Sequence, residues 1–325
     1  MQHRIVILGA GYAGAIAAGR LARRLRGDAQ ITLVNAEPDF VERIRMHQLA
    51  TGQDLPTRPL SEALAGTGAT LRVARVTGVD VDRKLVTVAD ADGTDELGYD
   101  TLVYALGSSV AHHHVRGVAE HAHEVASRPG ALRLRARLQE LEAGARVVVV
   151  GGGLTGIEAA TEIAESHEQL EVALVARGGF GDWLSPRGQR HLRKVFGRLG
   201  ITVHEEVDVA RVDATELVTT DGARIPTDVT VWTAGFAAHP LAAATSLTVS
   251  DSGRIVVDET MRSVSHPDVY AVGDAAPSAF RASGSIGGVG RTPVFDVELD
   301  AESLLLDELA RSFPPLTGLT GVIAG

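Results

Sequence analysis

The first part of the chain alternates between short apolar runs and a helical pattern. Residues 4–8 form an apolar run rich in β-branched side chains, and an Ala-, Leu- and Arg-rich helical pattern follows to about residue 26. A second strand-like run occupies residues 31–34. Strand, helix and strand in this order predict a βαβ unit whose two strands are parallel.

The same pattern returns near the middle of the chain. Residues 146–150 form an apolar strand, a helical pattern extends to about residue 165, and residues 170–176 form the next strand. The two units begin about one domain's length apart, so the repeat predicts two domains of the same α/β class.

Further strands are predicted outside these units. Residues 70–90 alternate apolar and polar positions around a turn at residues 82–84, which is typical of antiparallel strands. The apolar runs at residues 101–108 and 228–235 are typical of buried strands.

The second half of the chain adds a helix with clear start signals and a less regular end. Residues 185–200 are predicted as a helix, with Ser185 as the N-cap and Pro186 in the first helical position. Residues 282–293 are rich in Gly and Ser and are typical of a loop. Residues 300–313 have the pattern of an amphipathic helix.

Composition narrows the class of protein. The 325 residues suffice for about two domains. The formal net charge of −10 disfavours nucleic acid and anionic membranes as partners. The N-terminus has no charged-then-apolar leader, and no apolar run is long enough to span a membrane, so we expect a cytoplasmic protein.

Each predicted strand–helix junction carries the pattern G-x-G-x-x-G. The first glycine of such a loop allows a tight turn, the second lets the backbone approach a pyrophosphate, and the third lets the helix pack closely on the strand. The helix N-terminus then offers N–H groups and a partial positive charge to the anion. A glycine-rich turn without a ligand is the alternative, but two copies in this context favour two dinucleotide sites. The glycines are Gly9, Gly11 and Gly14 in the first copy and Gly151, Gly153 and Gly156 in the second.

The residues at the end of the second strand of each unit are candidates for binding the adenosine ribose. An acidic residue is expected about 20 residues after the first glycine motif. Asn35 occupies that position and Glu37 follows two residues later, so either could bind a ribose hydroxyl, and Glu37 could equally be a solvated turn residue. In the second unit Arg177 stands at this place without a carboxylate, which favours NADPH over NADH.

Arg177 is not the only basic residue in this region. The following helix carries Arg187, Arg190 and Arg193, which would add to a site for a 2′-phosphate. An ordinary basic helix face is the alternative interpretation.

Three further segments join the paired motifs. They read YDTLVYALGS at residues 99–108, TVWTAGF at 230–236 and DVYAVGDAA at 268–276. Together with the glycine motifs they resemble the two-dinucleotide-binding-domain flavoproteins, the pyridine nucleotide-disulfide oxidoreductase superfamily. Within it the chain looks most like the type II NADH dehydrogenase and ferredoxin-reductase-like members, over about residues 3–281.

The resemblance implies an α/β fold of two Rossmann-type three-layer domains, with a discontinuous FAD-binding domain. The FAD-binding domain would comprise residues 1–112 and 254–325, and the NAD(P)H-binding domain residues 113–253. The implied cofactors are FAD and either NADPH or NADH.

The resemblance also implies which residues bind each cofactor. Asp274 would accept a hydrogen bond from the flavin ribityl chain, and Leu106 stands where the family usually has Thr. The FAD-binding candidates are Gly9, Gly11, Tyr12, Ala13, Gly14, Asn35, Ala36, Glu37, Arg43, Val76, Ala105, Leu106, Gly107, Gly273 and Asp274. The NAD(P)H-binding candidates are Gly151, Gly153, Leu154, Thr155, Gly156, Arg177 and Gly235.

Three residues are catalytic candidates. Glu158 matches an acidic residue that in the family often lies near the nicotinamide–flavin junction. Arg45 and His47 belong to the segment 40–52, which in the family approaches the isoalloxazine, and His47 has the side chain best suited to proton transfer near neutral pH. The alternative is that this segment forms a helix surface over the sheet.

No metal site is predicted. His112, His113 and His114 are consecutive, so their side chains point in different directions, and a polar interdomain linker is the preferred interpretation.

The chain departs from the family in two ways. It has no cysteine, so a redox dithiol is impossible. Hydride would pass from NAD(P)H to flavin N5 and directly to a small organic acceptor, an electron-transfer protein or dioxygen. The segment after Asp274 also differs from the usual flavin-facing helix and following domain, which makes a quinone-reducing membrane enzyme less favoured.

The acidic helix predicted over residues 300–313 could take the place of the flavin-facing helix. It could instead join a partner subunit in a homo-oligomer through Leu305, Leu306 and Leu309, or pack on its own domain. Two other functions remain open: a flavin-binding scaffold or sensor with little turnover, and a biosynthetic flavoenzyme that oxidises a specialised substrate.

Overall fold

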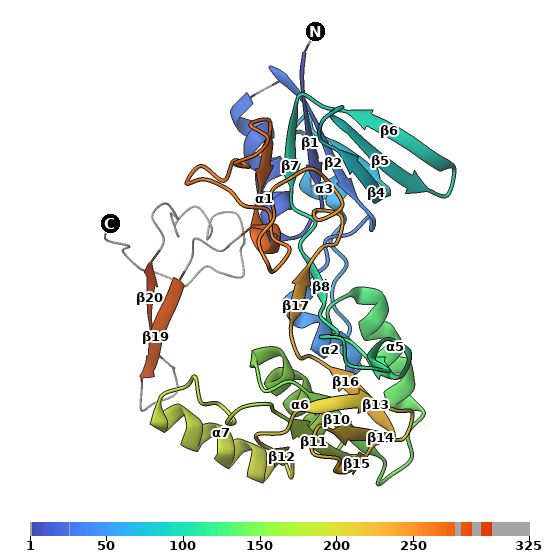
Figure 1. Cartoon of the computed structure of the whole chain (residues 1–325), viewed down its shortest axis with the longest axis vertical. Coiled ribbons are helices and arrows are strands. Elements are labelled where there is room, and N and C mark those ends of the chain that lie inside the picture. The colour runs from blue at the N-terminus through green and yellow to red at the C-terminus, as the bar shows by residue number, and fades with distance from the viewer. Residues whose placement is uncertain (1, 26, 277–280, 288–293, 301–325) are drawn as a thin grey trace. The chain divides into compact units, whose positions relative to one another are not determined.

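A computed structural model describes residues 2–25, 27–276, 281–287 and 294–300 (Figure 1). The chain divides into two compact units. The first consists of Met1–Pro38, Leu60–Gly107 and Ala238–Gly325, and the second of Asp39–Pro59 and Ser108–Ala237.

The first unit is built on a parallel sheet with the strand order β18-β7-β1-β2-β3. From β1 the chain crosses through α1 (Tyr12–Leu25) to β2, and later returns to the other side of β1 as β7. The order reverses at β1, which is where ligands bind in open α/β sheets. The strands are β1 (His3–Leu8), β2 (Ala29–Asn35), β3 (Thr70–Val73), β7 (Thr101–Tyr104) and β18 (Val269–Ala271).

A small antiparallel sheet of β4 (Arg75–Asp80), β5 (Leu85–Asp90) and β6 (Gly93–Gly98) completes the layers of the first unit. The alternating side chains of β1 place Val6 and Leu8 in one core cluster with residues of β4 and β5. Short helices α3 (Leu60–Ala63) and η2 (Gly273–Ala275) lie in the connections.

Two predicted features of this unit are wrong. Residues 70–73 are not antiparallel but form β3, which pairs in parallel with β2, because an alternating pattern predicts a strand without fixing its partner. Residues 282–287, predicted as loop, belong to β19 (Arg281–Gly287), which pairs with β20 (Val294–Asp300). Asp300 therefore ends a strand, and residues 301–313 of the predicted helix lie outside the described residues.

The second unit repeats this plan. Its parallel sheet has the order β12-β11-β10-β16-β9, with the reversal at β10, and α6 (Leu154–Ser166) follows β10 as α1 follows β1. A small antiparallel sheet again covers one face. The strands are β9 (Ala122–His123), β10 (Arg146–Val150), β11 (Glu171–Val175), β12 (Thr202–His204), β16 (Val229–Trp232) and, in the small sheet, β13 (Val209–Val212), β14 (Glu216–Thr219) and β15 (Arg224–Pro226).

Alternation along β10 explains the three layers of this unit. Val147 and Val149 pack in a cluster with α5 (Arg128–Gln139) and α6, whereas Val148 and Val150 pack with the small sheet. The core also holds α2 (Met46–Ala50), through Met46, Leu49 and Ala50. The remaining elements are η1 (Arg43–Arg45), β8 (Ser108–Val110), α4 (Val118–His121), α7 (Pro186–Arg198) and β17 (Phe236–Ala238), which pairs with β8.

The predicted fold class of two Rossmann-type α/β units is confirmed, as is the helix start at Ser185, whose hydroxyl accepts a hydrogen bond from the Gly188 N–H at 3.3 Å. The compact units have boundaries that differ from the predicted cofactor domains. Residues 39–59 belong to the second unit and residues 238–253 to the first.

Candidate functional site

The first glycine loop joins β1 to α1 and is built on close backbone contacts. A Cβ on Gly9 would overlap with the carbonyl oxygen of Ala105, and a Cβ on Gly14 would overlap with the carbonyl oxygen of Gly9. Gly9 also has φ of +91°, a conformation that favours glycine. A Cβ on Gly11, by contrast, would meet no atom of the described chain within 4 Å. Gly9 and Gly14 thus serve packing, whereas Gly11 leaves space above the loop.

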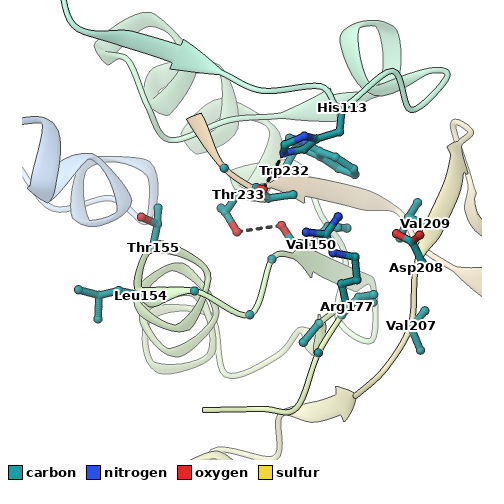
Figure 2. Close-up of a pocket in the computed structure, with 18 of the residues that line it drawn as sticks. His113, Val150, Leu154, Thr155, Arg177, Val207, Asp208, Val209, Trp232 and Thr233 are labelled. Atoms are coloured by element: carbon teal, nitrogen blue, oxygen red, sulfur yellow. Dashed lines mark hydrogen bonds between the residues drawn. The ribbon is translucent and has the colours of Figure 1, made fainter. Parts of the chain in front are cut away.

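The second glycine loop has the same construction. A Cβ on Gly151 would lie 2.6 Å from Thr233 Oγ1, and one on Gly156 would overlap with the carbonyl oxygen of Gly151. Gly153 again has open space around its Cβ position within the described structure. Thr233 is itself held by a hydrogen bond from its hydroxyl to the Val150 carbonyl at 2.9 Å (Figure 2). The residues at both loops therefore fit a dinucleotide pyrophosphate at the start of a helix.

Most of the predicted FAD-binding positions come together around the first loop. Ala105 and Leu106 lie against Gly9, and a Cβ on Gly273 would lie 3.1 Å from the Ala13 side chain at the start of α1. Asp274 is exposed and follows Gly273 in η2. Tyr12, Ala36 and Gly107 are at least partly accessible in the same unit.

Two predicted FAD-binding residues lie elsewhere. The Val76 side chain is buried in the core of the first unit. Arg43 belongs to the second unit, where its guanidinium lies 4.5 Å from the centre of the Phe236 ring and donates a hydrogen bond to Ser108 Oγ at 3.1 Å. Their assignment to the FAD site stays a prediction.

Asn35 has a structural task in the first loop. Its Oδ1 accepts a hydrogen bond from the Ala10 N–H at 2.8 Å, and its Nδ2 donates to the Glu37 carbonyl at 2.8 Å. This side chain fixes the end of β2 against the glycine loop. Of the two candidates for the ribose, Glu37 is therefore the one whose side chain is not used in this link.

The second unit contains a cavity of about 490 Å³ next to its glycine loop (Figure 2). The cavity is lined by the loop after β10, the loop after β11, the start of β13 and the end of β16. It includes six of the seven predicted NAD(P)H-binding positions, namely Gly151, Gly153, Leu154, Thr155, Arg177 and Gly235. The lining residues that the motifs did not predict are His113, Val115, Val150, Gly152, Val175, Ala176, Gly178, Gly179, Asp182, Trp183, Val207, Asp208, Val209, Trp232, Thr233, Ala234 and Phe236.

Arg177 is the basic residue of this cavity. Its side chain is exposed, and within the described part of the chain no hydrogen bond or ion pair engages it. Asp208 lines the same cavity and would partly offset its charge (Figure 2).

The basic residues of α7 lie outside the lining of the cavity that contains Arg177. Arg193 forms a bidentate ion pair with Glu205, at 2.8 and 2.7 Å, and Arg187 and Arg190 lie outside the cavity lining. The Arg193 guanidinium also holds the pKa of Glu205 at about 2, helped by the Phe180 N–H. Of the predicted basic residues, Arg177 is the one that lines this cavity.

The catalytic candidates Glu158 and His47 are brought together in the second unit. His47 Nδ1 lies 3.9 Å from Glu158 Oε2. Burial lowers the pKa of His47, and the charge of Glu158 acts in the opposite direction. Burial raises the pKa of Glu158, which His47 counteracts. The two opposite shifts bring the pKa values of His47 and Glu158 closer together.

Arg45 makes local contacts in the segment that carries it, and its catalytic role stays a prediction. Its guanidinium donates to Glu42 Oε2 at 3.1 Å and to Gln48 Oε1 at 2.8 Å, so it braces the segment before α2. It still contributes to His47, because its positive charge is among the causes that lower the pKa of His47.

His113 lines the cavity although no motif predicts it. The histidine run was interpreted as a linker, yet His113 Nε2 lies 3.0 Å from the Ala234 carbonyl oxygen and its ring lines the cavity (Figure 2). His113 and His114 both have positive φ, a signal that the sequence does not reveal. Within the described residues, no three His, Asp or Glu side chains are placed to hold a metal ion.

Comparison with known proteins agrees with this geometry. Residues 3–293 match the model of the family described as pyridine nucleotide-disulphide oxidoreductase. The chain belongs to this family. The predicted resemblance and the predicted oxidoreductase class are confirmed at that level.

The chain is similar to several curated relatives. It is 31% identical over 297 residues to an NADH dehydrogenase-like protein of Mycobacterium tuberculosis, covering 84% of this chain and 72% of the relative. It is 28% identical to a demethylphylloquinone reductase of Synechocystis, with the same two coverages of 84% and 72%.

Solved structures share the fold. NDH2 from Plasmodium falciparum in complex with NADH has a TM-score of 0.75 at 20% identity, covering 85% of this chain and 65% of that protein. An NAD-dependent persulfide reductase from A. fulgidus has a TM-score of 0.69 at 26% identity, covering 84% and 53%. The chain thus spans less than two thirds of each of these solved proteins. None of the helices in the described residues is long and apolar enough to cross a membrane.

The two kinds of glycine in each loop separate folding from binding. We expect Gly14→Ala and Gly156→Ala to destabilise the protein by at least about 1–3 kcal/mol, because the new methyl group overlaps with a backbone carbonyl. Gly11→Ala and Gly153→Ala should change the unfolding free energy by less than about 0.5 kcal/mol and instead weaken dinucleotide binding. Urea unfolding and dinucleotide titration of all four variants measure this, and equal loss of stability in both pairs would contradict the assignment.

Glu205 is predicted to hold the loop after β11 through its charge. Glu205→Gln should cost up to about 1 kcal/mol at pH 7, because a partly exposed charged network is lost. The folded pKa of about 2 lies below the ordinary 4.5, so this contribution is present above pH 4.5 and is lost as the pH falls toward 2. The stability difference between wild type and variant, from urea melts at pH 7 and pH 4, should therefore shrink on acidification.

The matched control is Glu171→Gln, which removes a more exposed ion pair with Arg146. Its effect should stay within about 0.5 kcal/mol at both pH values. A Glu205→Gln penalty that grows at low pH would rule out the charge explanation.

Proposed function

We propose that this chain is an FAD-dependent NAD(P)H dehydrogenase that passes electrons to a quinone or another small organic acceptor. The observation that carries the proposal is the pair of glycine loops, which have the same packing in two units of the same topology. Each loop leaves room above its middle glycine at the start of a helix, which suits one dinucleotide per unit.

The first unit is proposed to bind FAD. The glycine loop would take the pyrophosphate, Glu37 the adenosine ribose, and Asp274 the ribityl chain. The packing of Ala105 and Gly273 against the loop supports this, because it gathers segments that are distant in sequence around one position. FAD, when bound, supplies the chemistry of accepting a hydride and releasing its electrons to a second substrate.

The second unit is proposed to bind the nicotinamide dinucleotide in its cavity of about 490 Å³, a size that suits a cofactor. The loop at Gly151–Gly156 would take the pyrophosphate. His47 and Glu158 would act as a titratable pair, since His47 Nδ1 and Glu158 Oε2 lie 3.9 Å apart. Quinone reduction consumes protons as well as electrons, so a titratable pair in the unit that would bind the nicotinamide dinucleotide suits this chemistry.

The choice of acceptor is supported by the names of relatives. Among them are a demethylphylloquinone reductase and a type II NADH:quinone oxidoreductase of Mycobacterium tuberculosis, the latter 27% identical over 84% of this chain. The chain has no cysteine, so the proposed route needs no dithiol between the cofactor and the acceptor.

The choice of nicotinamide is proposed to include NADPH. The loop after β11 offers Arg177 and no carboxylate in the position that would repel a 2′-phosphate. The names of several relatives refer to NADH, and Asp208 lines the same cavity. Because Arg177 can pair with a 2′-phosphate, we propose that the chain uses NADPH at least as well as NADH.

Arg177→Ala tests the 2′-phosphate. We expect the KM for NADPH to rise about tenfold and that for NADH to change less than about twofold, because only NADPH carries the second phosphate. Arg187→Ala, a substitution on α7 outside the cavity, is the matched control and should change neither KM. An equal rise for both nucleotides would remove the proposed role of Arg177.

Anaerobic mixing of the FAD-loaded protein with NADH or NADPH tests the reaction itself. We expect the visible absorbance of the oxidised flavin to disappear and to return when a water-soluble quinone is added. Dioxygen and ferricyanide serve as comparison acceptors. If tightly bound FAD is reduced by neither nucleotide, the dehydrogenase is wrong and a flavin-binding scaffold is favoured instead.

A further inference from the structure

Trp183 is an exposed aromatic residue at the edge of the cavity in the second unit. Its relative exposure is 55%, and it lines the cavity together with Arg177, Gly178, Gly179 and Asp182. Ligand pockets are lined mainly by hydrophobic and aromatic side chains. An aromatic ring that is exposed at the edge of a cavity is therefore suited to contact a ligand.

The residues that precede Trp183 in the chain are anchored to the rest of the second unit. The Phe180 ring is buried and packs on Phe196, with ring centres 4.5 Å apart. The Phe180 N–H donates to Glu205 Oε1 at 2.7 Å, and Glu205 is held in turn by Arg193.

The residue that follows Trp183 in the chain is anchored as well. The Leu184 N–H donates to the Gly181 carbonyl at 2.9 Å, and the Leu184 carbonyl accepts from Gln189 Nε2 at 3.0 Å. Trp183 is thus presented from an anchored backbone, so ordering its side chain on a ligand costs little backbone entropy.

The position of Trp183 in the cavity indicates which part of a dinucleotide it would meet. It lies on the loop that follows β11, the second strand of the βαβ unit. In Rossmann-type units this loop receives the adenosine ribose, while the glycine loop receives the pyrophosphate. Phe236 and Gly235, which follow β16, line the cavity from a different strand end.

We infer that Trp183 is the stacking platform for the adenine ring of the nicotinamide dinucleotide. This inference rests on the proposed function, because it requires that the cavity bind such a dinucleotide. Stacking on an indole is favourable for any planar base and needs no hydrogen bond from the side chain. Trp183 would therefore set affinity for the adenosine end and leave the rate at saturating nucleotide almost unchanged.

Intrinsic fluorescence offers a direct test. The chain has two tryptophans, Trp183 and Trp232, and both line the cavity. Trp232 is buried, and its Nε1–H donates to the Ala111 carbonyl at 2.8 Å. The Trp183→Phe variant retains Trp232 alone, so the difference between wild type and this variant reports Trp183 without disturbing the buried residue.

The probe is ADP-ribose, added to the FAD-loaded protein. ADP-ribose has the adenosine end and lacks nicotinamide, so it neither reduces the flavin nor absorbs in the emission range of tryptophan. We expect ADP-ribose to quench the emission of wild type and to leave that of Trp183→Phe almost unchanged. Nicotinamide mononucleotide, which lacks adenine, should quench neither protein.

Affinity gives the second measurement. Trp183→Ala should weaken ADP-ribose binding about tenfold in calorimetry, and Trp183→Phe less than about threefold, because a phenyl ring still stacks. The KM for the preferred nicotinamide nucleotide should rise about tenfold in Trp183→Ala while kcat changes less than about twofold. Rescue by Phe distinguishes stacking from a merely structural role.

The outcomes separate this inference from the proposed function. If ADP-ribose binds in calorimetry but does not change the wild-type emission, or binds Trp183→Ala as tightly as wild type, Trp183 is not the platform and the proposed function is unaffected. If neither ADP-ribose nor NADH nor NADPH binds the FAD-loaded protein, the proposed function and the inference both fail.

Discussion

The close contact between each helix and its glycine loop is the constraint on which both units depend. The third glycine of each motif, Gly14 or Gly156, lies so near the carbonyl of the first that no side chain fits between them. This contact brings the first turn of the helix directly beside the end of the central strand. The N-terminus of the helix is thereby aimed at the point where the strand order reverses, which is the place that suits an anionic ligand.

The other features of the candidate sites follow from this placement. In the first unit Asn35 ties the end of β2 to the loop through Ala10, and Gly273 packs beside Ala13 at the start of α1. In the second unit Thr233 lies beside Gly151, as Ala105 lies beside Gly9 in the first, and the Thr233 hydroxyl donates a hydrogen bond to the Val150 carbonyl at the end of β10. The same topology thus carries different supporting side chains, which is consistent with two different dinucleotides.

Local patterns predicted the parts of the structure that depend on neighbours in sequence. The βαβ units, the glycine loops and the start of α7 at Ser185 are decided by residues within one or two turns of each other, and the structure has them as predicted. Partners distant in sequence were not predictable in this way. Residues 70–73 joined the parallel sheet, and Arg193 pairs with Glu205, because strand pairing and ion pairing are fixed only when the fold brings the segments together.

The candidate site residues also divide into those that a local motif predicts and those that only the fold brings to the site. Positions defined by a motif line the cavity or surround the loop, whereas His113 and Trp183 carry no motif and were not assigned to a site. His47 and Glu158 were suggested by a family resemblance, and their separation of 3.9 Å comes from the packing of α2 in the core of the second unit.

The central claim is that each unit binds its own dinucleotide. Calorimetric titration of the FAD-loaded protein with NADPH or NADH under anaerobic conditions, together with a count of FAD per chain, tests it most directly. The account predicts one FAD and one nicotinamide nucleotide per chain, bound at the same time. Displacement of FAD by the nicotinamide nucleotide, or saturation with a single dinucleotide per chain, would contradict it.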